Sequence, residues 1–594
     1  MKKLFTGNEA IARGAYEAGV KFACAYPGTP STEILENIAT YKEDIVAEWA
    51  PNEKVALEAA IGASLAGARS ISSMKHVGVN VAADPLFTYA YMGVNGGMVL
   101  VSADEPGMHS SQNEQDNRNI ARFAKMPMFE PSDSQEAKDM IVEAFEISEK
   151  YDAPVLFRIT TRIAHSKGIV ECFDRKEVGI KPYVKNVKKN VPVPAHGRDL
   201  RLKVDRMHKE MEVYSNDSPL NYEEINNTKI GIIASGTPYR FAKEVFGKDA
   251  SYFKVGFSYP LPMDKMKAFA EKVDTLYVIE ENDPLMETEL KAAGIMCHGR
   301  DTFPVTGEMT PDVIREAMFG ETLPTITYEK DKVVGRPPTL CAGCPHRGFF
   351  YEIAKRKNTV ISGDIGCYSL GFAEPYNAMD LSICMGASIS AGYGAQKVFN
   401  MKDGNDMRVV TMLGDSTFFH TGMNSLLNTV YNRSNTINVI LDNRITGMTG
   451  HQENPGTGYT AQGMPTKVVE IEPIVRALGI EHVKTVDPNK LDEMKAALDW
   501  AYALDEPSVI ITRWPCVLKK FSDEDREEFP QAFSTNCVID HEKCIGCRKC
   551  IKTGCPALSF DKTTKKASIN KNDCVACTVC LQTCPVDAIS KEEK

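Results

Sequence analysis

The stretch "VVTMLGDSTFFHTG", residues 409–422, is an apolar, partly β-branched run that stops at a Gly-Asp pair and continues with helical periodicity. After it, "TGMNSLLNTVYNR" (421–433) predicts a helix and "TINVILDN" (436–443) predicts a second buried strand. A right-handed β-α-β crossover makes the carboxyl ends of two such strands neighbours. Asp415 and Asn443 are therefore expected together at the sheet edge where α/β folds bind ligands.

The totals bound the class of protein. At 594 residues the chain is too long for a single hydrophobic core, so several domains are expected. The net charge is -10 and no Lys/Arg block stands out, which argues against nucleic acid as a partner. The N-terminus "MKKLFTGNEA" reaches polar residues before any apolar stretch, and no run approaches ~18 apolar residues. These features predict a cytoplasmic protein that does not enter a membrane.

Strand and helix patterns predict an α/β protein with several domains. Residues 1–185 alternate apolar runs with helical stretches, as in a parallel sheet. The lysine-rich residues 186–227 are interpreted as a linker with a partly helical stretch, and 228–325 as a small α/β domain. Residues 335–520 form a third α/β unit, and 535–594 a cysteine-rich α+β domain.

The cysteine-rich tail carries the most specific motif. It reads C-x2-C-x2-C-x4-C-P at 544–556 and C-x2-C-x2-C-x3-C-P at 574–585, which is similar to bacterial two-cluster ferredoxins. In that pattern the fourth cysteine of each run binds the other cluster. One 4Fe-4S cluster is then assigned to Cys544, Cys547, Cys550 and Cys584, and the other to Cys574, Cys577, Cys580 and Cys555. Zinc or unligated thiols are the alternative, and the extra residue before Cys555 departs from the pattern.

The residues around the Gly-Asp turn suit a divalent cation. Asp415, Asn443 and the carbonyl of Ile445 are hard oxygen ligands of the kind that Mg²⁺ or Ca²⁺ prefers when it holds a diphosphate. Gly414 permits the tight turn, and Ser416 can offer its backbone N–H to a phosphate. An Asp that merely caps a helix explains a lone Gly-Asp turn equally well.

Other motifs resemble one family. Thiamine diphosphate enzymes carry Gly-Asp-Gly and then Asn after about 25 to 30 residues, and here Asn443 follows Gly414 by 29 positions, with Ser416 as second-glycine replacement. "YPGTPSTEI" (26–34) and "NEKVALEAAIGASLAGA" (52–68) resemble the pyrimidine-binding domain of 2-oxoacid:ferredoxin oxidoreductases. With "CAGCPHRG", "GDIGCYSLG", "CMGAS" (which contains Gly386, a candidate cofactor contact) and "DNRITGMTGHQ", the resemblance covers essentially the whole chain.

The resemblance implies a fold and roles for residues of the first domain. It implies two thiamine-diphosphate-binding α/β domains, with a small transketolase-C-terminal-like α/β domain between them. Glu53 would contact N1' of the aminopyrimidine, with Glu58 as the competing choice about 140° around the helix. Thr29 would lie beside the substrate, and His76, next to Lys75, would approach it. Arg118 and Arg122 are candidates for pairing with the substrate carboxylate.

Cysteines of the third domain extend the resemblance. Related enzymes hold a cluster near the thiamine, which here would use Cys341, Cys344, Cys367 and Cys516 as a possible third 4Fe-4S site, with Cys384 as the rival fourth ligand. Buried, inert thiols are the alternative. Three histidines beside these motifs are candidate phosphate donors or proton shuttles, although local hydrogen bonding is the simpler role for each: His346, His420 and His451.

The implied activity is oxidative decarboxylation of an arylpyruvate with coenzyme A, with external ferredoxin as electron acceptor. Family members have one further domain, so a small β subunit in an α2β2 complex, with thiamine sites at domain contacts, is expected. Action on another 2-oxoacid, non-oxidative decarboxylation, and an electron-relay subunit without catalysis remain alternatives.

Overall fold

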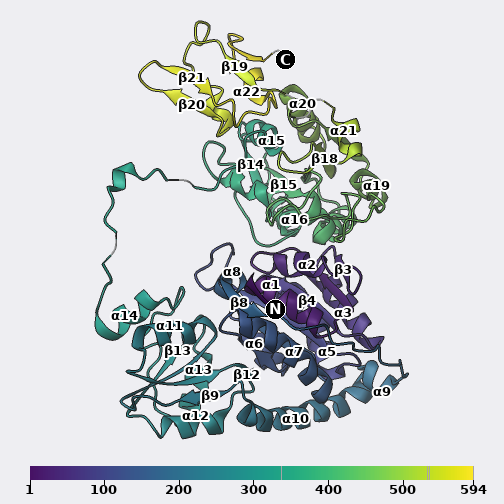
Figure 1. Cartoon of the computed structure of the whole chain (residues 1–594). Coiled ribbons are helices and arrows are strands. Elements are labelled where there is room, and N and C mark those ends of the chain that lie inside the picture. The colour runs from purple at the N-terminus through teal and green to yellow at the C-terminus, as the bar shows by residue number, and fades with distance from the viewer. Residues whose placement is uncertain (325, 336, 531–532, 534, 593–594) are drawn as a thin grey trace. The chain divides into compact units, whose positions relative to one another are not determined.

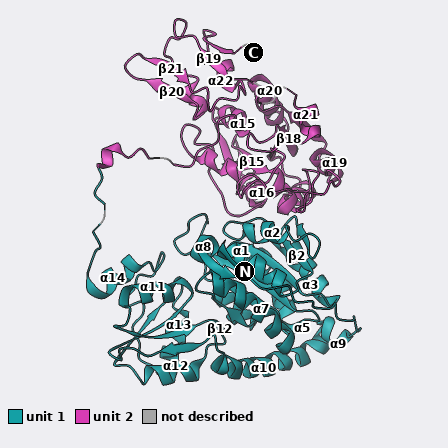
Figure 2. Ribbon diagram, in the orientation of Figure 1, with its two compact units in different colours: residues 1–328 teal, residues 329–594 magenta. Residues whose placement is uncertain are grey.

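The computed structural model describes residues 1–594 apart from 325, 336, 531–532, 534 and 593–594. The chain forms two compact units, Met1–Tyr328 and Glu329–Lys594, shown in different colours in Figure 2. Each unit contains a parallel sheet with helices, so the predicted α/β class is confirmed.

The main sheet of unit 1 has seven strands in the order β12-β6-β7-β5-β4-β2-β3, and only the β12–β6 pair is antiparallel. Figure 1 labels β3, β4 and β12 of this sheet. The strands are β2 (Phe22–Ala25), β3 (Val46–Trp49), β4 (Ser70–Lys75), β5 (Met98–Asp104), β6 (Met128–Phe129), β7 (Val155–Thr160) and β12 (Phe257–Tyr259). Every residue of β5 and β7 is buried, as expected for a parallel sheet covered on both faces.

Two helical layers cover this sheet. Alternate residues of β5 show the two faces: Val99 and Val101 pack in one core cluster, and Leu100 in another. The first cluster contains α1 (Gly7–Glu17) and α7 (Ser134–Tyr151), which contact each other, and the second contains α3 (Glu53–Leu65) and α5 (Ala83–Met92). Further elements of unit 1 are β1 (Lys2–Thr6), α2 (Thr32–Ile38), α4 (His76–Val81), α6 (Arg118–Ala124), α8 (Thr161–His165), β8 (Lys167–Glu171), α11 (Gly236–Phe246), α12 (Met263–Ala270), α13 (Leu285–Ala292) and α14 (Pro311–Phe319).

The lysine-rich segment and the small α/β region are integrated into the same unit. The segment contains α9 (Val187–Asn190) and the long α10 (Pro194–Asp217), which buries Val204, Met207 and Met211 at helical spacing. It ends in β9 (Tyr222–Glu224), which joins a second sheet in the order β13-β10-β11-β9. The other strands of that sheet are β10 (Ile230–Ser235), β11 (Ser251–Val255) and β13 (Thr275–Ile279). Strands of three residues such as β9 and β12 are too short to give a readable alternation.

The sheet of unit 2 is entirely parallel, in the order β14-β15-β16-β18-β17. Its strands are β14 (Thr359–Ser362), β15 (Arg408–Gly414), β16 (Ile437–Asp442), β17 (His482–Val486) and β18 (Ser508–Arg513). The helices are α15 (His346–Ile353), α16 (Ala387–Phe399), α17 (Asp415–Thr417), α18 (Met423–Tyr431), α19 (Ile471–Ala477), α20 (Leu491–Tyr502) and α21 (Asp523–Glu528), and a π-helical turn, η3 (Phe418–Gly422), joins α17 to α18. Gly414 lies opposite Leu441, so β15 and β16 end at the same edge.

The cysteine-rich tail packs on this sheet domain within unit 2. Its described residues contain two antiparallel strand pairs, β19 (Cys537–Ile539) with β22 (Ile589–Lys591) and β20 (Leu558–Asp561) with β21 (Lys566–Ile569). They also contain a short α-helix, α22 (Val579–Gln582), and a 3-10 turn at Ile551–Thr553. The Thr553 carbonyl accepts hydrogen bonds from Arg347 Nη1 at 3.1 Å and from the Tyr376 hydroxyl at 2.5 Å. Gln582 Nε2 donates to the Asn489 carbonyl at 2.7 Å. These contacts fix the tail against the domain that precedes it.

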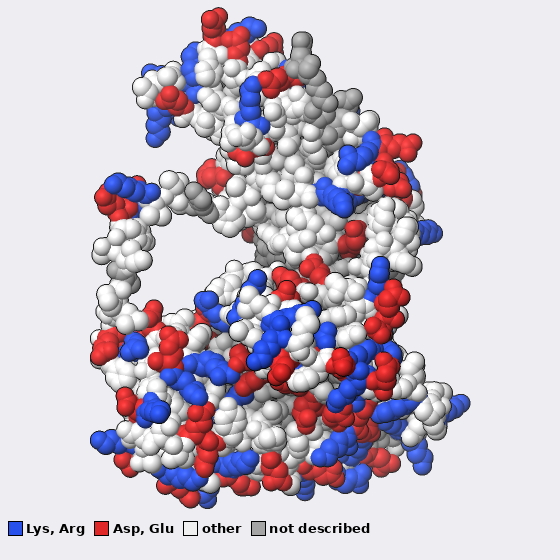
Figure 3. Space-filling view, viewed as in Figure 1, with Lys and Arg blue, Asp and Glu red and all other residues white. Residues whose placement is uncertain are grey.

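Among the described residues, no helix combines the length and the apolar composition needed to cross a bilayer. Lys and Arg side chains are interspersed with Asp and Glu over the face of unit 1 seen in Figure 3, so this face has no continuous basic track.

Candidate active site and iron-sulfur sites

The edge of the unit 2 sheet gathers a polar cluster around Asp415. Asp415 is the first residue of α17, directly after β15, and only 3% of its surface is exposed. Asn454 Nδ2 donates to Asp415 Oδ2 at 3.0 Å, and Thr446 Oγ1 donates to Ser416 Oγ at 3.0 Å. Asn443 follows β16 at the same edge and accepts from the backbone N–H of the buried Ile445 at 3.3 Å. The structure thus brings Asp415, Ser416, Asn443 and Ile445 to one edge.

The charge balance at this edge suits a cation. Burial and the nearby Asp442 raise the pKa of Asp415 to about 7, against the effect of the Asn454 hydrogen bond. Asp442 is itself neutralised by Arg513 at 3.0 Å, whereas no Lys, Arg or His ion pair reaches Asp415 in the described part of the chain. A buried carboxylate that lacks a positive partner fits Mg²⁺ or Ca²⁺. Asn454 was not predicted, because it lies in an irregular loop with no periodicity.

Gly386 marks a second turn beside this edge. It precedes α16 with a left-handed φ of 83°, and an added Cβ would lie 2.0 Å from Thr421 Oγ1, so only glycine fits. Its backbone N–H and that of Ser388 donate to Asp364, a buried carboxyl whose pKa burial raises to about 6. Asp364 therefore shapes the start of α16, a role the sequence did not reveal.

The three candidate histidines differ in their surroundings. His346 is buried beside Tyr368, and burial lowers its pKa to about 4. His420 lies in the π-helical turn that follows α17, with Nδ1 3.2 Å from Thr421 Oγ1. His451 has a left-handed φ of 69°. Burial therefore favours the neutral form of His346.

Glu53 lies in a buried corner of unit 1. It is the first residue of α3, after Asn52, whose side chain caps the helix by accepting from Val55 N at 2.9 Å. Its carboxyl packs on Gly78 of α4, where an added Cβ would lie 2.7 Å from Glu53 Oε1. Glu58 instead forms an exposed ion pair with Lys54. The structure therefore places Glu53 inside the domain and Glu58 outside.

His76 and the Tyr-Pro-Gly-Thr-Pro motif border the same region. His76 begins α4 and is fully buried; its Nε2 lies 3.3 Å from the Asn113 carbonyl, and its Nδ1 has no hydrogen-bond partner among the described residues. Lys75 reaches Glu105 at 3.2 Å, and its Cβ would lie 3.1 Å from a Cβ added to Gly28, the neighbour of Thr29. A buried ring nitrogen without a partner is consistent with a ligand site near α4.

Each of the two candidate arginines forms an ion pair with a carboxylate of the small α/β region. Arg118 is 1% exposed and pairs with Asp116 at 2.6 Å and Glu280 at 2.8 Å. Arg122 pairs with Glu289 at 2.6 Å. The buried Arg118 pairs link the main sheet domain to the small α/β region, whereas the Arg122–Glu289 pair lies at the surface, with 48% of the Arg122 side chain exposed.

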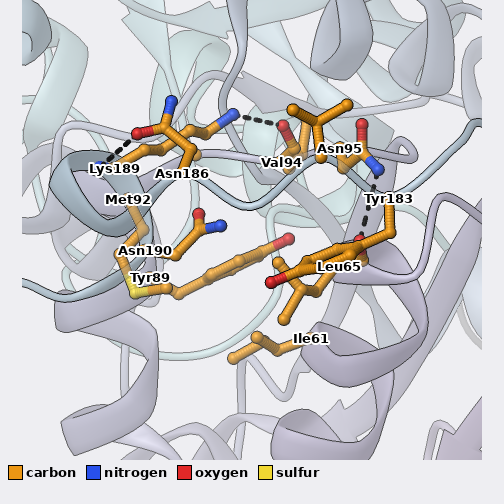
Figure 4. Close-up of a pocket in the computed structure, with 12 residues that line it drawn as sticks. Ile61, Leu65, Tyr89, Met92, Val94, Asn95, Tyr183, Asn186, Lys189 and Asn190 are labelled. Atoms are coloured by element: carbon orange, nitrogen blue, oxygen red, sulfur yellow. Dashed lines mark hydrogen bonds between the residues drawn. The ribbon is translucent and has the colours of Figure 1, made fainter.

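A cavity of about 200 Å³ lies at the other end of α3 (Figure 4). It is lined by Ile61 and Leu65 of α3, by Tyr89 and by residues of the 183–190 segment. Lys189 Nζ donates to the Val94 carbonyl at 2.6 Å, which anchors that segment. Ile61 follows Glu53 by eight residues, or about 12 Å along the helix, so this cavity and the Glu53 corner are separate.

The tail cysteines line two separate cavities. One is lined by Cys544, Cys547, Cys550 and Cys584, and the other by Cys555, Cys574, Cys577 and Cys580, together with Cys537. Backbone N–H groups donate to two of these sulfurs at 3.2 Å: Ala588 to Cys584 and Cys537 to Cys574. No three of the described His, Cys, Asp and Glu side chains converge on one point as around a single metal ion. Each four-thiol set surrounds a cavity instead, which fits a larger cluster.

Cys341, Cys344, Cys367 and Cys516 form a third group. Burial raises the pKa of Cys344 and raises that of Cys367 to about 11. Neighbouring thiols add to both shifts: Cys367 and Cys516 to the first, and Cys516 and Cys341 to the second. Cys516 N–H donates to the Asn443 carbonyl at 3.0 Å, which places the group beside the Asp415 edge. Cys384 is exposed, and its charged neighbour is Asp364 rather than another thiol.

Comparison with known families defines the class. Residues 13–217 match the family described as pyruvate flavodoxin/ferredoxin oxidoreductase, thiamine diP-bdg; residues 364–512 match the C-terminal binding domain of thiamine pyrophosphate enzymes; and residues 536–585 match a 4Fe-4S dicluster domain. The chain is a thiamine diphosphate-dependent 2-oxoacid:ferredoxin oxidoreductase that carries 4Fe-4S clusters.

Similar proteins narrow the family. A protein of Archaeoglobus fulgidus named indolepyruvate oxidoreductase subunit IorA is 40% identical over 99% of this chain and 97% of its own length. One of the same name from Methanothermobacter thermautotrophicus is 40% identical over 100% and 98%. The 2-oxoglutarate synthase subunit KorA of that organism is 27% identical over 49% and 90%. The chain belongs to the family of indolepyruvate oxidoreductase IorA subunits.

Proposed function

We propose that the chain is the catalytic subunit for CoA-dependent oxidative decarboxylation of arylpyruvates such as indolepyruvate and phenylpyruvate, giving acyl-CoA, CO₂ and reduced ferredoxin. The observation that carries the substrate class is the near full-length similarity to proteins named indolepyruvate oxidoreductase subunits. Because those relatives are named as subunits, we further propose a small β subunit and an α2β2 assembly.

Unit 2 would hold the diphosphate end of the cofactor. Asp415, Asn443 and the Ile445 carbonyl would bind Mg²⁺ or Ca²⁺, and the raised pKa and missing positive partner of Asp415 support this assignment. Gly386 and Gly414 would leave room for the cofactor, and Ser416 N–H would donate to a phosphate.

Unit 1 would hold the aminopyrimidine end. Glu53 would exchange a proton with N1' of the aminopyrimidine and so favour its imino tautomer. Thiamine diphosphate, when bound, supplies a carbon nucleophile, and this tautomer promotes its formation. Thr29 and His76 would line the substrate side. The His76 Nδ1, which has no hydrogen-bond partner in the described part of the chain, supports a polar ligand there.

Clusters held by the chain's own cysteines would carry the electrons away. A third 4Fe-4S cluster at Cys341, Cys344, Cys367 and Cys516 would lie beside Asn443, where electrons leave the substrate. Iron analysis of the purified holoprotein tests this step. About twelve iron atoms per chain would support three clusters, and about eight would reject the third.

A pure electron relay is the competing function. An electron relay does not require a thiamine diphosphate site, so it would not explain a buried Asp415 without a positive partner among the described residues, or the buried position of Glu53. Action on a different 2-oxoacid, such as 2-oxoglutarate, is supported by a partial similarity, over 49% of this chain, to a 2-oxoglutarate synthase subunit.

One assay separates these possibilities. The purified complex is incubated anaerobically with methyl viologen and indolepyruvate, phenylpyruvate, pyruvate or 2-oxoglutarate, each with and without CoA. We expect CoA-dependent dye reduction with the aryl substrates. Faster reduction with pyruvate or 2-oxoglutarate would reject the substrate class, and no reduction with any substrate would favour the relay.

A further inference from the structure

The two cysteine cavities of the tail differ in what covers them. The second cavity is lined by Ala342 and Gly343 of the preceding domain, and Val575 packs so closely on Gly343 that an added Cβ would lie 2.1 Å from its Cγ2. The first cavity is lined only by residues of the tail itself. There Cys547 is exposed and Ile545 has 64% of its surface exposed. The second site therefore faces inward, next to Cys341, and the first faces solvent.

Basic side chains surround the outward-facing site. We call Lys543, Arg548, Lys549, Lys552, Lys565 and Lys566 the basic rim. Residues 540–552 and 561–566 contain seven Lys and Arg against three Asp and Glu, although the chain as a whole has a net charge of -10. In Figure 3, basic side chains project from this β20–β21 end of unit 2 together with some acidic ones.

The rim residues of the cysteine loop (543–552) and those of the β20–β21 hairpin (565 and 566) pack together. Lys566 on β21 donates to the Cys544 carbonyl, and the Lys565 carbonyl lies 2.3 Å from where a Cβ of Gly546 would be. Arg548 stacks over Phe560 of β20 at 4.2 Å. The hairpin and the cysteine loop thus form one surface over the first cavity.

Two of the three acidic residues of these segments accept backbone N–H groups. Asp540 accepts those of Glu542 and Lys543, and Asp561 accepts that of Thr563 in the hairpin turn. Lys543 is 3.8 Å from Asp540, a distance at which an exposed pair contributes little. The excess of positive charge in these segments, seven basic against three acidic side chains, therefore remains available to a partner.

We propose that the basic rim docks an acidic electron-carrier protein, which takes electrons from a cluster held by Cys544, Cys547, Cys550 and Cys584. The proposal rests on the proposed function only for the source of the electrons. In each transfer the chain's reduced cluster loses one electron and the carrier's oxidised centre gains one, and no bond or proton is exchanged. Opposite charge accelerates such encounters by roughly 10- to 1000-fold at low ionic strength, and salt removes the effect.

The test supplies electrons without any substrate, so it is independent of the proposed reaction. The as-isolated holoprotein is reduced with a stoichiometric amount of dithionite and mixed in a stopped-flow instrument with an oxidised, acidic two-cluster ferredoxin. K543E/K549E/K552E reverses three exposed charges of the rim. K185E/K188E/K209E is the matched control, since its three lysines are exposed on unit 1. Iron content and the visible spectrum show that each variant retains its clusters.

We expect the rim variant to reduce ferredoxin at least about 10-fold more slowly at low salt and to lose most of its salt dependence. The control variant should behave like the wild type. Methyl viologen, a small dication, should be reduced by the rim variant at an unchanged or higher rate. A ferredoxin rate that is unchanged in the rim variant, or that falls equally in the control, would overturn the proposal.

Discussion

Glu53 in unit 1 and Asp415 in unit 2 are both buried carboxylates at the first position of a helix, yet their surroundings differ. Asp415 lies near a second carboxylate, Asp442, and its neighbouring donor is the neutral amide of Asn454. Glu53 instead packs on the backbone of Gly78, two residues after the buried His76. The first arrangement leaves two carboxylates close together and fits an added cation, whereas the second holds one carboxyl in a fixed position against α4.

Removing the ionisable group of Glu53 should have the largest effect, because a fixed amide cannot exchange a proton. We expect Glu53→Gln to lower kcat by at least ~1000-fold, within the range of general acid–base effects. Thiamine diphosphate content and the iron-sulfur absorbance should remain unchanged. Glu58→Gln is the control and should keep wild-type activity, since Glu58 is exposed. Near-normal turnover in Glu53→Gln would mean that the buried position of Glu53 is only structural.

Asp415→Asn should weaken binding of the metal and the cofactor rather than slow the chemical step. This is the difference expected from the contrast between Asp415 and Glu53. The variant keeps the size of the side chain but loses the charge, so we expect about a 100-fold weaker affinity for Mg²⁺ and thiamine diphosphate. Activity should recover in part when both are raised in concentration. Cofactor binding is measured by quenching of protein fluorescence, and Asp403→Asn, on the surface, serves as control. Loss of kcat that excess cofactor never restores would contradict a metal-binding role.

Moving the Glu53 carboxyl without changing it should have an intermediate effect. In Gly78→Ala the new Cβ would lie 2.7 Å from Glu53 Oε1 and 2.8 Å from its Cγ, so the carboxyl must shift. A displacement of this size should lower kcat about 10-fold. Gly62→Ala, in the same helix as Glu53, has no atom within 4 Å of its added Cβ and should leave kcat unchanged. Equal kcat in both variants would show that the position of Glu53 does not matter.

Local pattern and spacing made part of the structure predictable from the sequence. The strands that end at Gly414 and Asp442, the helix that begins at Glu53, and the pairing of the tail cysteines across two runs all depend on periodicity or on fixed intervals. Asn454 and Asp364 could not be predicted, because each reaches its partner through a loop or turn of irregular conformation. The engagement of Arg118 was hidden for a related reason, since Glu280 lies 162 residues away in the chain.

Glu281 shows the effect of burying a carboxyl in the absence of a proposed ligand, and its contribution should be the smallest. It is 3% exposed and accepts from Met309 N–H at 3.1 Å, and burial raises its pKa from 4.5 to about 7 although Arg158 and Arg118 oppose this. The folded state therefore binds the proton more tightly than the unfolded state. This contribution to stability is complete below pH 4.5 and is lost as the pH rises through 7.

We expect the free energy of unfolding of unit 1 to fall by roughly 1 to 3 kcal/mol between pH 5 and pH 8 because of this residue, since a pKa change of one corresponds to about 1.4 kcal/mol. Glu281→Gln, which stays neutral, should flatten the profile over this range, as measured by urea denaturation at several pH values. Glu308→Gln, which removes a neighbouring negative charge, should only lower the pH at which the loss of stability is complete. An unchanged slope in Glu281→Gln would assign the pH dependence to the other buried acids, Asp104 and Glu280. If Glu281 behaves as expected while Asp415 binds metal, then burial raises the pKa of both carboxyls, and the absence of a nearby cation is what distinguishes the binding site.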